Sequence, residues 1–482
     1  DVLVKLGKID EALLFAEESY RKDPDNLTTL FVLGDIYTKK GRLNDAAAVY
    51  QSVIEKMPES QDGYLNLAMV YTNQGKYAEA AQILDTLIQQ DPNNVTAYYY
   101  LGVIFFQQEK YNKSEEYFLK ALEIRPEMDG ALQNLGVIRE INGDLEAAQT
   151  YYLKAIRVNP HNMEVLDRLS RLYIKMNQLP EAIEQLRKLS TILPGNIDIR
   201  RKIALLYLEA EEYEKAADEF REIVSRAPDD METRYYLALA LEYLKRYDEA
   251  LVQFDDILTH DPQNINAYLH KGYIFIDQKQ YQKAVDMYDK ALSIRDDNPE
   301  IYAQISMAYI EMNDYGKAES VALKGLEKFP DSPALHFNIA VLYEKMGRKD
   351  EMISHLRTVI MLNPEHAEAL NYLGYTFAEM GANLDEALSL VKKALELKPK
   401  SAYILDSLGW VYYKMGKFKE SLEQLKKAVS IVPDDPVMLD HLGDVYNALG
   451  KKKEAKEAWE KALVNHEKEK GLQERVEKKL RQ

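Results

Sequence analysis

The side chains that could carry chemistry in this 482-residue chain are carboxylates, histidines and hydroxyls, because cysteine is absent. Disulfides, thiol catalysis, zinc ribbons and iron–sulfur clusters are therefore excluded. The eight histidines do not cluster at the spacing of metal ligands. His270 and His441 occupy equivalent places in well-separated segments, and His336 and His355 fall on different expected helices. We interpret each as an ordinary residue on the face of a helix.

No pattern of residues points to catalysis. Adjacent carboxylates such as Asp255 and Asp256 could serve as a general acid and base, but such pairs occur throughout so acidic a chain and carry no catalytic information. The sequence has no glycine-rich phosphate or dinucleotide loop, no GxSxG nucleophile, no HExxH zinc motif and no EF-hand loop. We therefore predict a protein that is not an enzyme and that uses no cofactor and no metal.

The charge balance excludes a further class of function. The chain carries 62 Lys and Arg against 79 Asp and Glu, a net charge of −17 at pH 7. Nucleic-acid binders show a basic footprint, so we expect protein partners and no nucleic acid. No apolar run approaches the roughly 18 to 20 residues that a membrane-spanning helix needs, so we also expect no transmembrane segment.

One group of basic residues stands out against the acidic total. It could anchor an acidic segment or the C-terminal carboxylate of a partner. It could equally be paired within its own helices, because Glu164 precedes Arg168 by four residues, as Asp167 precedes Arg171. The spacing favours the paired interpretation. The members of the group are Arg168, Arg171, Lys175, Arg200, Arg201 and Lys202.

The elements that must position these side chains follow from a fixed period of 34 residues. Within each repeat, apolar residues at i, i+3, i+4 and i+7 predict a first helix, and a small residue further on, usually Ala, marks a second helix. One residue is inserted near 381–383, and Asp296 stands where a proline is expected. The prolines that set the period are Pro24, Pro58, Pro92, Pro126, Pro160, Pro194, Pro228, Pro262, Pro330, Pro364, Pro399 and Pro433.

Three positions of the repeat, counted from its first residue, explain how its helices pack. Position 8 is Gly, Ala or Ser in every repeat and position 20 is mostly Ala, so two helix backbones can approach closely. Position 11 is mostly aromatic and fills the space beside that contact. The glycines Gly41, Gly75, Gly143, Gly347, Gly416 and Gly450 are expected to supply a left-handed turn at the end of the first helix.

This combination of period and packing residues resembles the tetratricopeptide repeat over essentially the whole chain. The resemblance implies an all-α, right-handed superhelical solenoid of about thirteen helical hairpins with a concave inner surface. We expect a partial N-terminal repeat over 1–26, complete repeats over 27–466 and a C-terminal capping helix over 467–482. The complete repeats are expected to start near residues 27, 61, 95, 129, 163, 197, 231, 265, 299, 333, 367, 402 and 436.

Positions 2, 5, 9, 12 and 13 form a second stripe on the first helix, which points away from the paired helix. Position 9 is apolar in ten repeats, which indicates either contact between successive first helices or an apolar floor for a segment of a partner. Aromatic residues on this stripe have the composition of interaction hot spots. With Arg168, Arg171, Lys175 and Arg201, the candidate partner-binding residues are Phe31, Tyr99, Phe106, Tyr235, Tyr243, Tyr273, Phe337, Tyr375, Trp410 and Tyr413.

The C-terminal part carries a more particular signature, in which Leu373-Gly374-Tyr375, Leu408-Gly409-Trp410 and His441-Leu442-Gly443 take equivalent places and Ala458-Trp459 closes the series. Over roughly residues 369–463 it resembles bacterial cell-envelope tetratricopeptide lipoproteins, including adaptors of C-terminal processing proteases. The resemblance implies a scaffold associated with the outer membrane and favours the periplasm over the cytoplasm. Its lipid anchor is then expected in a part of the native protein that precedes Asp1.

We therefore expect a non-enzymatic scaffold or adaptor that binds segments of partner proteins in its concave groove. Two alternatives stay open. In the first, the chain is the substrate-recruiting arm of a larger enzyme, such as a glycosyltransferase. In the second, it is a self-assembling array, against which the charged terminal helix argues.

Overall fold

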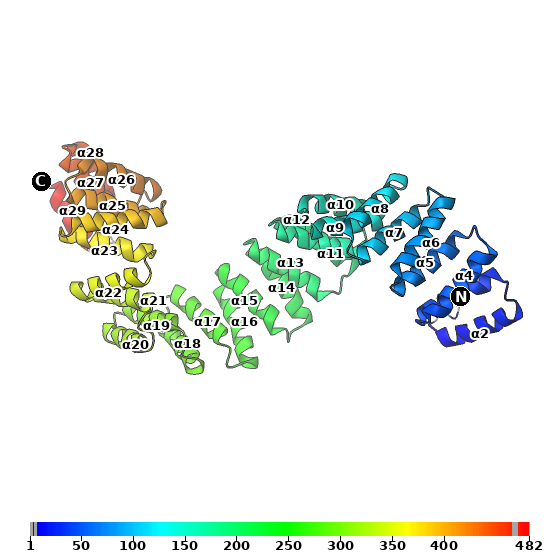
Figure 1. Ribbon diagram of the computed structural model, residues 1–482. Helices are drawn as coiled ribbons and strands as arrows, with labels where there is room; N and C mark the ends of the chain where they lie inside the picture. Colours follow the sequence, from blue (N-terminus) through cyan, green and yellow to red (C-terminus); the bar gives the residue numbers. More distant parts are fainter. Residues whose placement is uncertain (1–2, 4–6, 465–470, 482) are drawn as a thin grey trace. The chain divides into compact units, whose positions relative to one another are not determined.

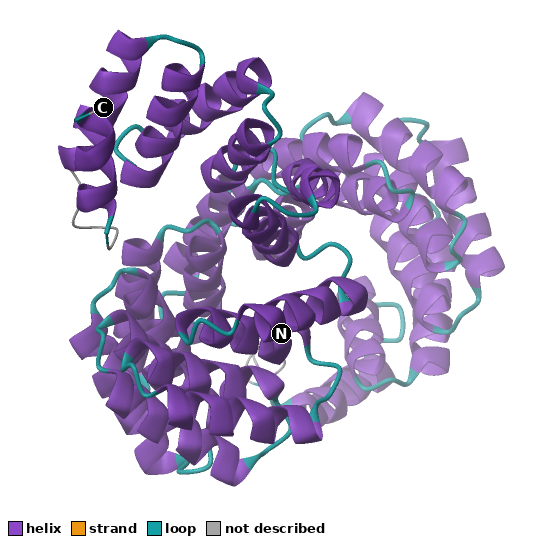
Figure 2. Ribbon diagram, turned by 90° about the vertical axis from the view of Figure 1, so that its left-hand side faces the viewer, coloured by secondary structure: helices purple, strands orange, loops and turns teal. Residues whose placement is uncertain are grey.

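The computed structural model describes residue 3, residues 7–464 and residues 471–481, and these form the helices α2 to α29 without any strand (Figure 1), (Figure 2). The prediction of an all-α solenoid of helical hairpins is confirmed. The chain divides into two compact units, Asp1–Leu244 and Lys245–Gln482. Among the described helices, none is both long and apolar enough to cross a membrane.

The first unit begins with a helix that precedes the complete pairs, and each later helix packs on the next. Its helices are α2 (Ile9–Lys22), α3 (Leu27–Lys39), α4 (Leu43–Lys56), α5 (Gln61–Asn73), α6 (Tyr77–Gln90), α7 (Val95–Gln107), α8 (Tyr111–Ile124), α9 (Asp129–Ile141), α10 (Leu145–Val158), α11 (Met163–Lys175), α12 (Leu179–Ile192), α13 (Ile197–Glu209), α14 (Tyr213–Arg226) and α15 (Met231–Tyr243).

The second unit continues the same alternation and ends in a short helix. Its helices are α16 (Tyr247–His260), α17 (Ile265–Asp277), α18 (Tyr281–Ile294), α19 (Pro299–Glu311), α20 (Tyr315–Lys328), α21 (Pro333–Lys345), α22 (Lys349–Leu362), α23 (Ala367–Met380), α24 (Leu384–Leu397), α25 (Ala402–Lys414), α26 (Phe418–Ile431), α27 (Pro436–Ala448), α28 (Lys452–Val464) and α29 (Leu472–Leu480).

Within each unit the helices are arranged as stacked pairs. The first helix of a pair begins at the first residue of a 34-residue repeat, as at Leu27, Gln61 and Pro436. Each helix packs on the helices before and after it, and first helices of successive pairs also touch, as α23 does with α25. One hairpin could not bury its apolar stripe alone, so neighbouring hairpins share a core.

The turn between the two helices of a pair is closed by one residue in the left-handed region. The six glycines predicted for this place have φ between 72° and 79°, which confirms the prediction. In other repeats a residue with a side chain takes the place at a φ of 57° to 61°, where its Cβ crowds the backbone and costs energy. These residues are Glu109, Asn177, Glu211, Lys245, Lys279 and Asn313.

The small residue at position 8 lets the backbone of the first helix lie directly against a ring of the second helix. A Cβ added to Gly272 would lie 2.3 Å from Cε1 of Tyr288, well inside van der Waals contact, and the Tyr288 side chain is fully buried. Glycine stands at position 8 in every repeat whose second helix carries Tyr or Trp opposite it. Where the opposite residue is Leu84, position 8 is Ala68.

The open end of the last pair is covered by α29. Leu472 and Val476 are buried against Trp459. The carboxylate of Asp440 on α27 accepts hydrogen bonds from Nε of Arg475 at 2.8 Å and from Nζ of Lys479 at 2.7 Å. The predicted capping helix corresponds to α29, while residues 467–470 and 482 of the predicted range lie outside the described residues, as do residues 1–2 and 4–6 of the partial first repeat.

Candidate partner-binding groove

Successive first helices are joined by hydrogen bonds and ion pairs between residues 35 apart in the sequence. In the second unit, Nδ2 of Asn338 donates to the carbonyl oxygen of Ala303 at 3.1 Å. Nδ1 of His441 lies 3.0 Å from Oδ1 of Asp406. These residues occupy positions 5 and 6 of their repeats, so the floor of the inner surface is built from contacts between neighbouring first helices.

A groove of about 660 Å³ follows the first helices α21, α23, α25 and α27 of the second unit. Its walls combine aromatic rings with carboxylates, and apolar side chains from α27 also line it. The residues that line it are Phe337 and Glu344 on α21, Glu368, Asn371, Tyr372 and Tyr375 on α23, Tyr403, Ile404, Asp406 and Ser407 on α25, Val437 and Met438 on α27, and Lys398, Ser401 and Asp435 in the connections.

The aromatic residues of the groove support one another. The ring of Phe337 stacks on His366 with a centroid distance of 5.0 Å and meets Tyr372 edge-on at 6.3 Å. Tyr403 is 63% exposed and stands at the rim. Fixed rings with exposed faces offer contact area at a low entropic cost, which is what a recognition surface needs.

A stack of aromatic rings lies below the groove. Trp410 is only 7% exposed, because its ring stacks on His441 at 4.0 Å and on Tyr413 at 4.8 Å. Its indole N–H donates to the carboxylate of Glu379. Among the candidates from the sequence, Phe337 and Tyr375 therefore line the groove, whereas Trp410 and Tyr413 belong to the packing that supports it.

His441 and Asp406 form an ion pair at the base of this stack. Burial alone would lower the pKa of His441, but the carboxylate of Asp406, followed by those of Asp440 and Asp444, raises it above the ordinary value of 6.5. The pair joins α25 to α27, and Asp406 also faces the groove. His441 thus compensates the negative charge of Asp406.

The other polar groups of the groove differ in how well they are paired. Lys398 forms an ion pair with Glu368. The hydroxyl of Tyr372 donates to Glu344, and burial together with this carboxylate raises the pKa of Tyr372 far above its ordinary value. The amide oxygen of Asn371 is buried and has no hydrogen-bond partner among the described residues.

Comparison with known protein families identifies the repeat. Several sequence models described as tetratricopeptide repeats match, and together they cover most of the chain. The matches described as "Tetratricopeptide repeat" fall at residues 3–61, 38–102 and 141–206, at 95–128, and at 333–366 and 438–463; "TPR repeat" matches 409–450, and "Psidin, N-terminal TPR repeats region" matches 201–339.

The chain is a tetratricopeptide-repeat protein. The matching descriptions name the repeat and not an envelope lipoprotein. The comparison with curated proteins found no match for this tetratricopeptide-repeat protein.

Three solved structures with a similar arrangement of helices are distant from this chain in sequence. The "APC/C hetero-tetramer Cut9-Hcn1" is 15% identical, with 92% of this chain and 94% of that chain covered and a TM-score of 0.42. Yeast Tom70 is 19% identical, with 76% and 91% covered and a TM-score of 0.42. "Naa15/Naa10 bound to HypK-THB" is 16% identical, with 90% and 67% covered and a TM-score of 0.39. Because these TM-scores are below 0.5, the three similarities give no information about the partners of this chain.

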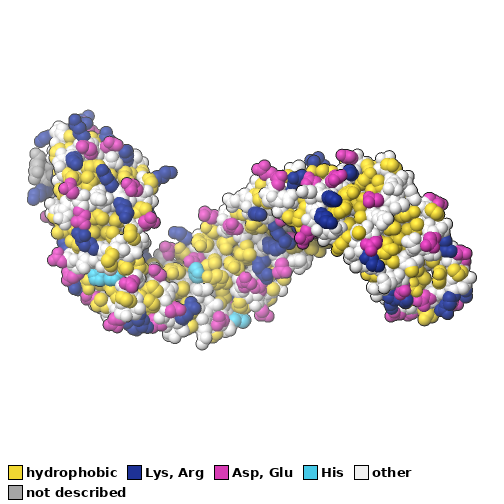
Figure 3. Space-filling model, in the orientation of Figure 1, with side chains coloured by type: hydrophobic (Ala, Val, Ile, Leu, Met, Phe, Trp, Pro, Cys, Tyr) yellow, Lys and Arg dark blue, Asp and Glu magenta, His cyan; other side chains and the backbone are white. Residues whose placement is uncertain are grey.

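The basic group of the first unit is largely paired with carboxylates of the same and neighbouring repeats. Arg168 bonds to Glu164 at 3.1 Å and Arg171 pairs with Asp167, at the spacing read from the sequence. Figure 3 shows basic side chains interspersed with acidic ones over the visible face of each unit. The remaining pairs join Arg200 to Glu219, Arg201 to Asp198 and Asp230, and Lys202 to Asp167, while Lys175 is exposed at the end of α11.

Apart from Trp410 and Tyr413, the aromatic candidates outside the groove are distributed over four repeats. Tyr273 on α17 is 41% exposed and meets His270 and Tyr288 edge-on. In the first unit each candidate ring packs on another ring: Phe31 on Tyr50, Tyr99 on Phe118, Phe106 on Tyr111, Tyr235 on Tyr236 and Tyr243 on Tyr213.

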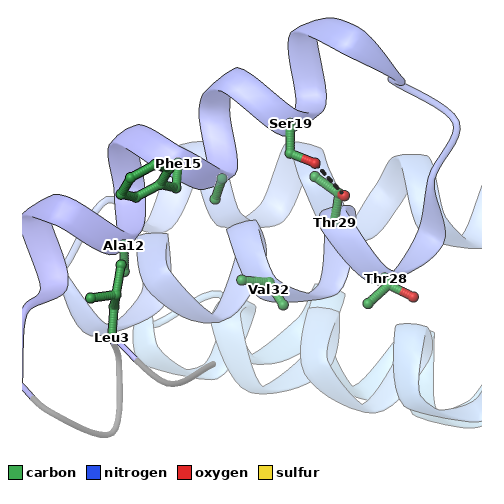
Figure 4. A pocket seen from close by; sticks show the side chains of 8 residues that line it. Leu3, Ala12, Phe15, Ser19, Thr28, Thr29 and Val32 are labelled. Atoms are coloured by element: carbon green, nitrogen blue, oxygen red, sulfur yellow. Dashed lines mark hydrogen bonds between the residues drawn. The ribbon is translucent and has the colours of Figure 1, made fainter.

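A smaller hollow of about 370 Å³ lies between α2 and α3 (Figure 4). Phe15 and Val32 border it, and the hydroxyls of Ser19 and Thr29 are 3.1 Å apart across it. Ala12 stands at position 20, which in complete tetratricopeptide repeats faces the first helix. The hollow is therefore a packing face of the repeat and brings no titratable side chains together.

Sequence reasoning missed several residues of the groove. Tyr372 and His441 occupy position 6, which was not counted in the inner stripe although it adjoins position 5 and faces the preceding first helix. Tyr403 occupies position 2 of the stripe, and its aromatic side chain was a signal that could have identified it. Within the described residues, no cluster of three or more His, Asp or Glu side chains could hold a metal ion.

Proposed function

We propose that this tetratricopeptide-repeat protein is an interaction scaffold that holds a segment of a partner protein in the groove along α21, α23, α25 and α27. The observation that carries the proposal is a groove whose walls combine aromatic rings with carboxylates and whose rim presents the exposed ring of Tyr403. A polypeptide supplies both the apolar surface and the N–H donors that these groups need.

The shape of the groove favours a segment of chain over a compact ligand. The groove crosses four first helices, and neighbouring helices pack about 8–10 Å apart. Three such steps span roughly 25–30 Å, which is about eight extended residues at 3.3 Å per residue. We propose binding and not catalysis, because the side chains that line the groove form no arrangement that supports a reaction.

Site-specific photo-cross-linking tests the proposal. A photo-reactive phenylalanine analogue in place of Tyr403 is expected to cross-link to a defined segment of a partner protein in cells that express the chain. The same analogue in place of Met361, which is 71% exposed on α22 outside the groove, is the matched control. Equal yields of the same products from both positions would show that the groove is not the binding surface.

The finer role that we propose is that of an adaptor in the bacterial cell envelope, which brings its partner to a processing protease. Its support is the signature over residues 369–463, within which most of the groove lies. The alternative is a substrate-recruiting arm of a larger enzyme such as a glycosyltransferase. The gene sequence on both sides of this chain tests the two: a signal peptide with a lipidation cysteine supports the adaptor, and a catalytic domain supports the arm.

A further inference from the structure

We propose that the groove along α21, α23, α25 and α27 selects a basic partner segment, one that carries arginine or lysine side chains near both of its ends. This inference rests on the proposed function, because it names the chemistry of the segment that the same groove would hold. The inference follows from the charges of the groove. The protein itself compensates some of them and leaves the others uncompensated.

The lining of the groove has a net formal charge of −3, since it contains four carboxylates and one ammonium group. Two of the carboxylates are compensated within the protein, Glu368 by Lys398 and Asp406 by His441. His366, which stacks on Phe337, accepts the backbone N–H of Ala369 with Nδ1 at 3.2 Å. The same nitrogen lies 3.5 Å from Oε2 of Glu368, so His366 stands beside a carboxylate that Lys398 already compensates.

Two carboxylates remain without a cationic partner among the described residues. Glu344 on α21 is exposed, and its one bonded neighbour in the groove is the neutral hydroxyl of Tyr372. Asp435 precedes α27 and accepts the backbone N–H groups of Val437 and Met438 at 3.0 Å each. Hydrogen bonds from neutral donors stabilise a carboxylate but leave its charge in place.

These two carboxylates stand at opposite ends of the groove, Glu344 on the first of its four helices and Asp435 at the N-cap of the last. An extended segment that crosses all four helices therefore meets a negative group where it enters and another where it leaves. An acidic segment would meet repulsion at both ends, and Lys398 cannot attract it because Glu368 already occupies that ammonium group.

The aromatic rings between the two carboxylates favour arginine in particular. Tyr403 presents an exposed ring at the rim, and Phe337 and Tyr372 line the wall beside Glu344. A guanidinium group stacks on aromatic faces while it donates two parallel hydrogen bonds to a carboxylate, which an ammonium group cannot do. The combination of ring and carboxylate matches that geometry, and lysine is expected to be the second choice.

Selection from a library of random dodecapeptides displayed on phage tests the proposal with the full chain as bait. The peptides retained are expected to be enriched in arginine, and then lysine, over aspartate and glutamate at two separated places. Glu344→Gln keeps an acceptor for Tyr372, and Asp435→Asn keeps an N-cap side chain, so neither change is expected to unfold the groove. Each is expected to weaken a selected peptide by about three- to tenfold, and to reduce the dependence of its affinity on salt.

Glu396→Gln is the matched control, because it removes the same charge from an exposed position on α24 outside the groove. This variant is expected to bind the selected peptides as the unchanged chain does. Selected peptides that are neutral or acidic, but that still lose affinity when Tyr403 is replaced by Ala, would overturn the charge preference and leave the proposed function standing. Peptides whose binding ignores Tyr403, Glu344 and Asp435 alike would overturn both.

Discussion

Replacing Gly272 by Ala tests how the repeats are packed, because this glycine marks the closest approach between a first helix and a ring. The added Cβ would lie 2.3 Å from Cε1 of Tyr288. Ordinary contact requires about 3.4 Å or more, so the ring must retreat by about 1 Å. Tyr288 is fully buried and packs in one cluster with Ala284 and Ile301, so a shift of its ring must displace these neighbours.

The expected magnitude is a balance of two terms. Overpacking a tight core costs about 1–3 kcal/mol. Alanine in the interior of a helix is about 1 kcal/mol more favourable than glycine, which offsets part of that cost. We therefore expect a net destabilisation of about 1–2 kcal/mol, confined to α17, α18 and their immediate neighbours, since each repeat contacts only the adjacent ones.

Hydrogen exchange followed by mass spectrometry is the assay, because a repeat array need not unfold in one cooperative step. Peptides from α17 and α18 are expected to lose protection, and peptides from α3 to α6 serve as the internal reference. Combining Gly272→Ala with Tyr288→Leu recreates the natural pairing of Ala68 with Leu84, so the two changes together should cost less than their sum. Additive costs, or a uniform loss of protection throughout the chain, would refute the packing argument.

Three further predictions concern a turn, an ion pair and the terminal helix. Lys279→Gly should stabilise the second unit by about 0.5–1 kcal/mol in chemical denaturation, because Lys279 has a φ of 58°; a loss of stability would refute the strain at this turn. The His441–Asp406 pair should contribute stability that is fully present below the ordinary histidine pKa of 6.5 and is lost as pH rises through the raised pKa of His441. Thermal unfolding monitored by tryptophan fluorescence, to which Trp410 and Trp459 both contribute, should show this loss, and His441→Gln should abolish the dependence. Asp440→Asn should release α29 at a cost of about 1–3 kcal/mol, seen as faster hydrogen exchange in α29 with no change in α21.

The helices could be predicted from the sequence because the signals that define them are local and repeated. Glycine at the turn and small residues at position 8 act within one hairpin, so a single period of 34 residues was enough to find each of them. The inserted residue was also visible: α23 runs to Met380, and both Gly381 and Asn383 then take left-handed conformations. Propensity and spacing determine such features without reference to distant parts of the chain.

The groove was harder to predict, because its character depends on which side chains meet across repeats. Trp410 has the composition of an exposed hot spot, yet His441, from the following repeat, covers its ring. The charge of Glu344 matters only because no cation from a neighbouring first helix reaches it among the described residues, and one sequence does not show that. Position 6 provides the contacts between helices, and its importance emerges only when the relative rotation of successive hairpins is known.

The left-handed turns have a consequence for how the array comes apart. Arrays of identical modules usually fray from their two extremities, where a module has one neighbour only. Here five consecutive repeats, from the one that contains Asn177 to the one that contains Asn313, have no glycine at the left-handed turn, whereas most of the other repeats do. On heating, these five repeats should therefore unfold at a lower temperature than expected for repeats with neighbours on both sides. The four C-terminal repeats, which include the groove, should stay folded to a higher temperature.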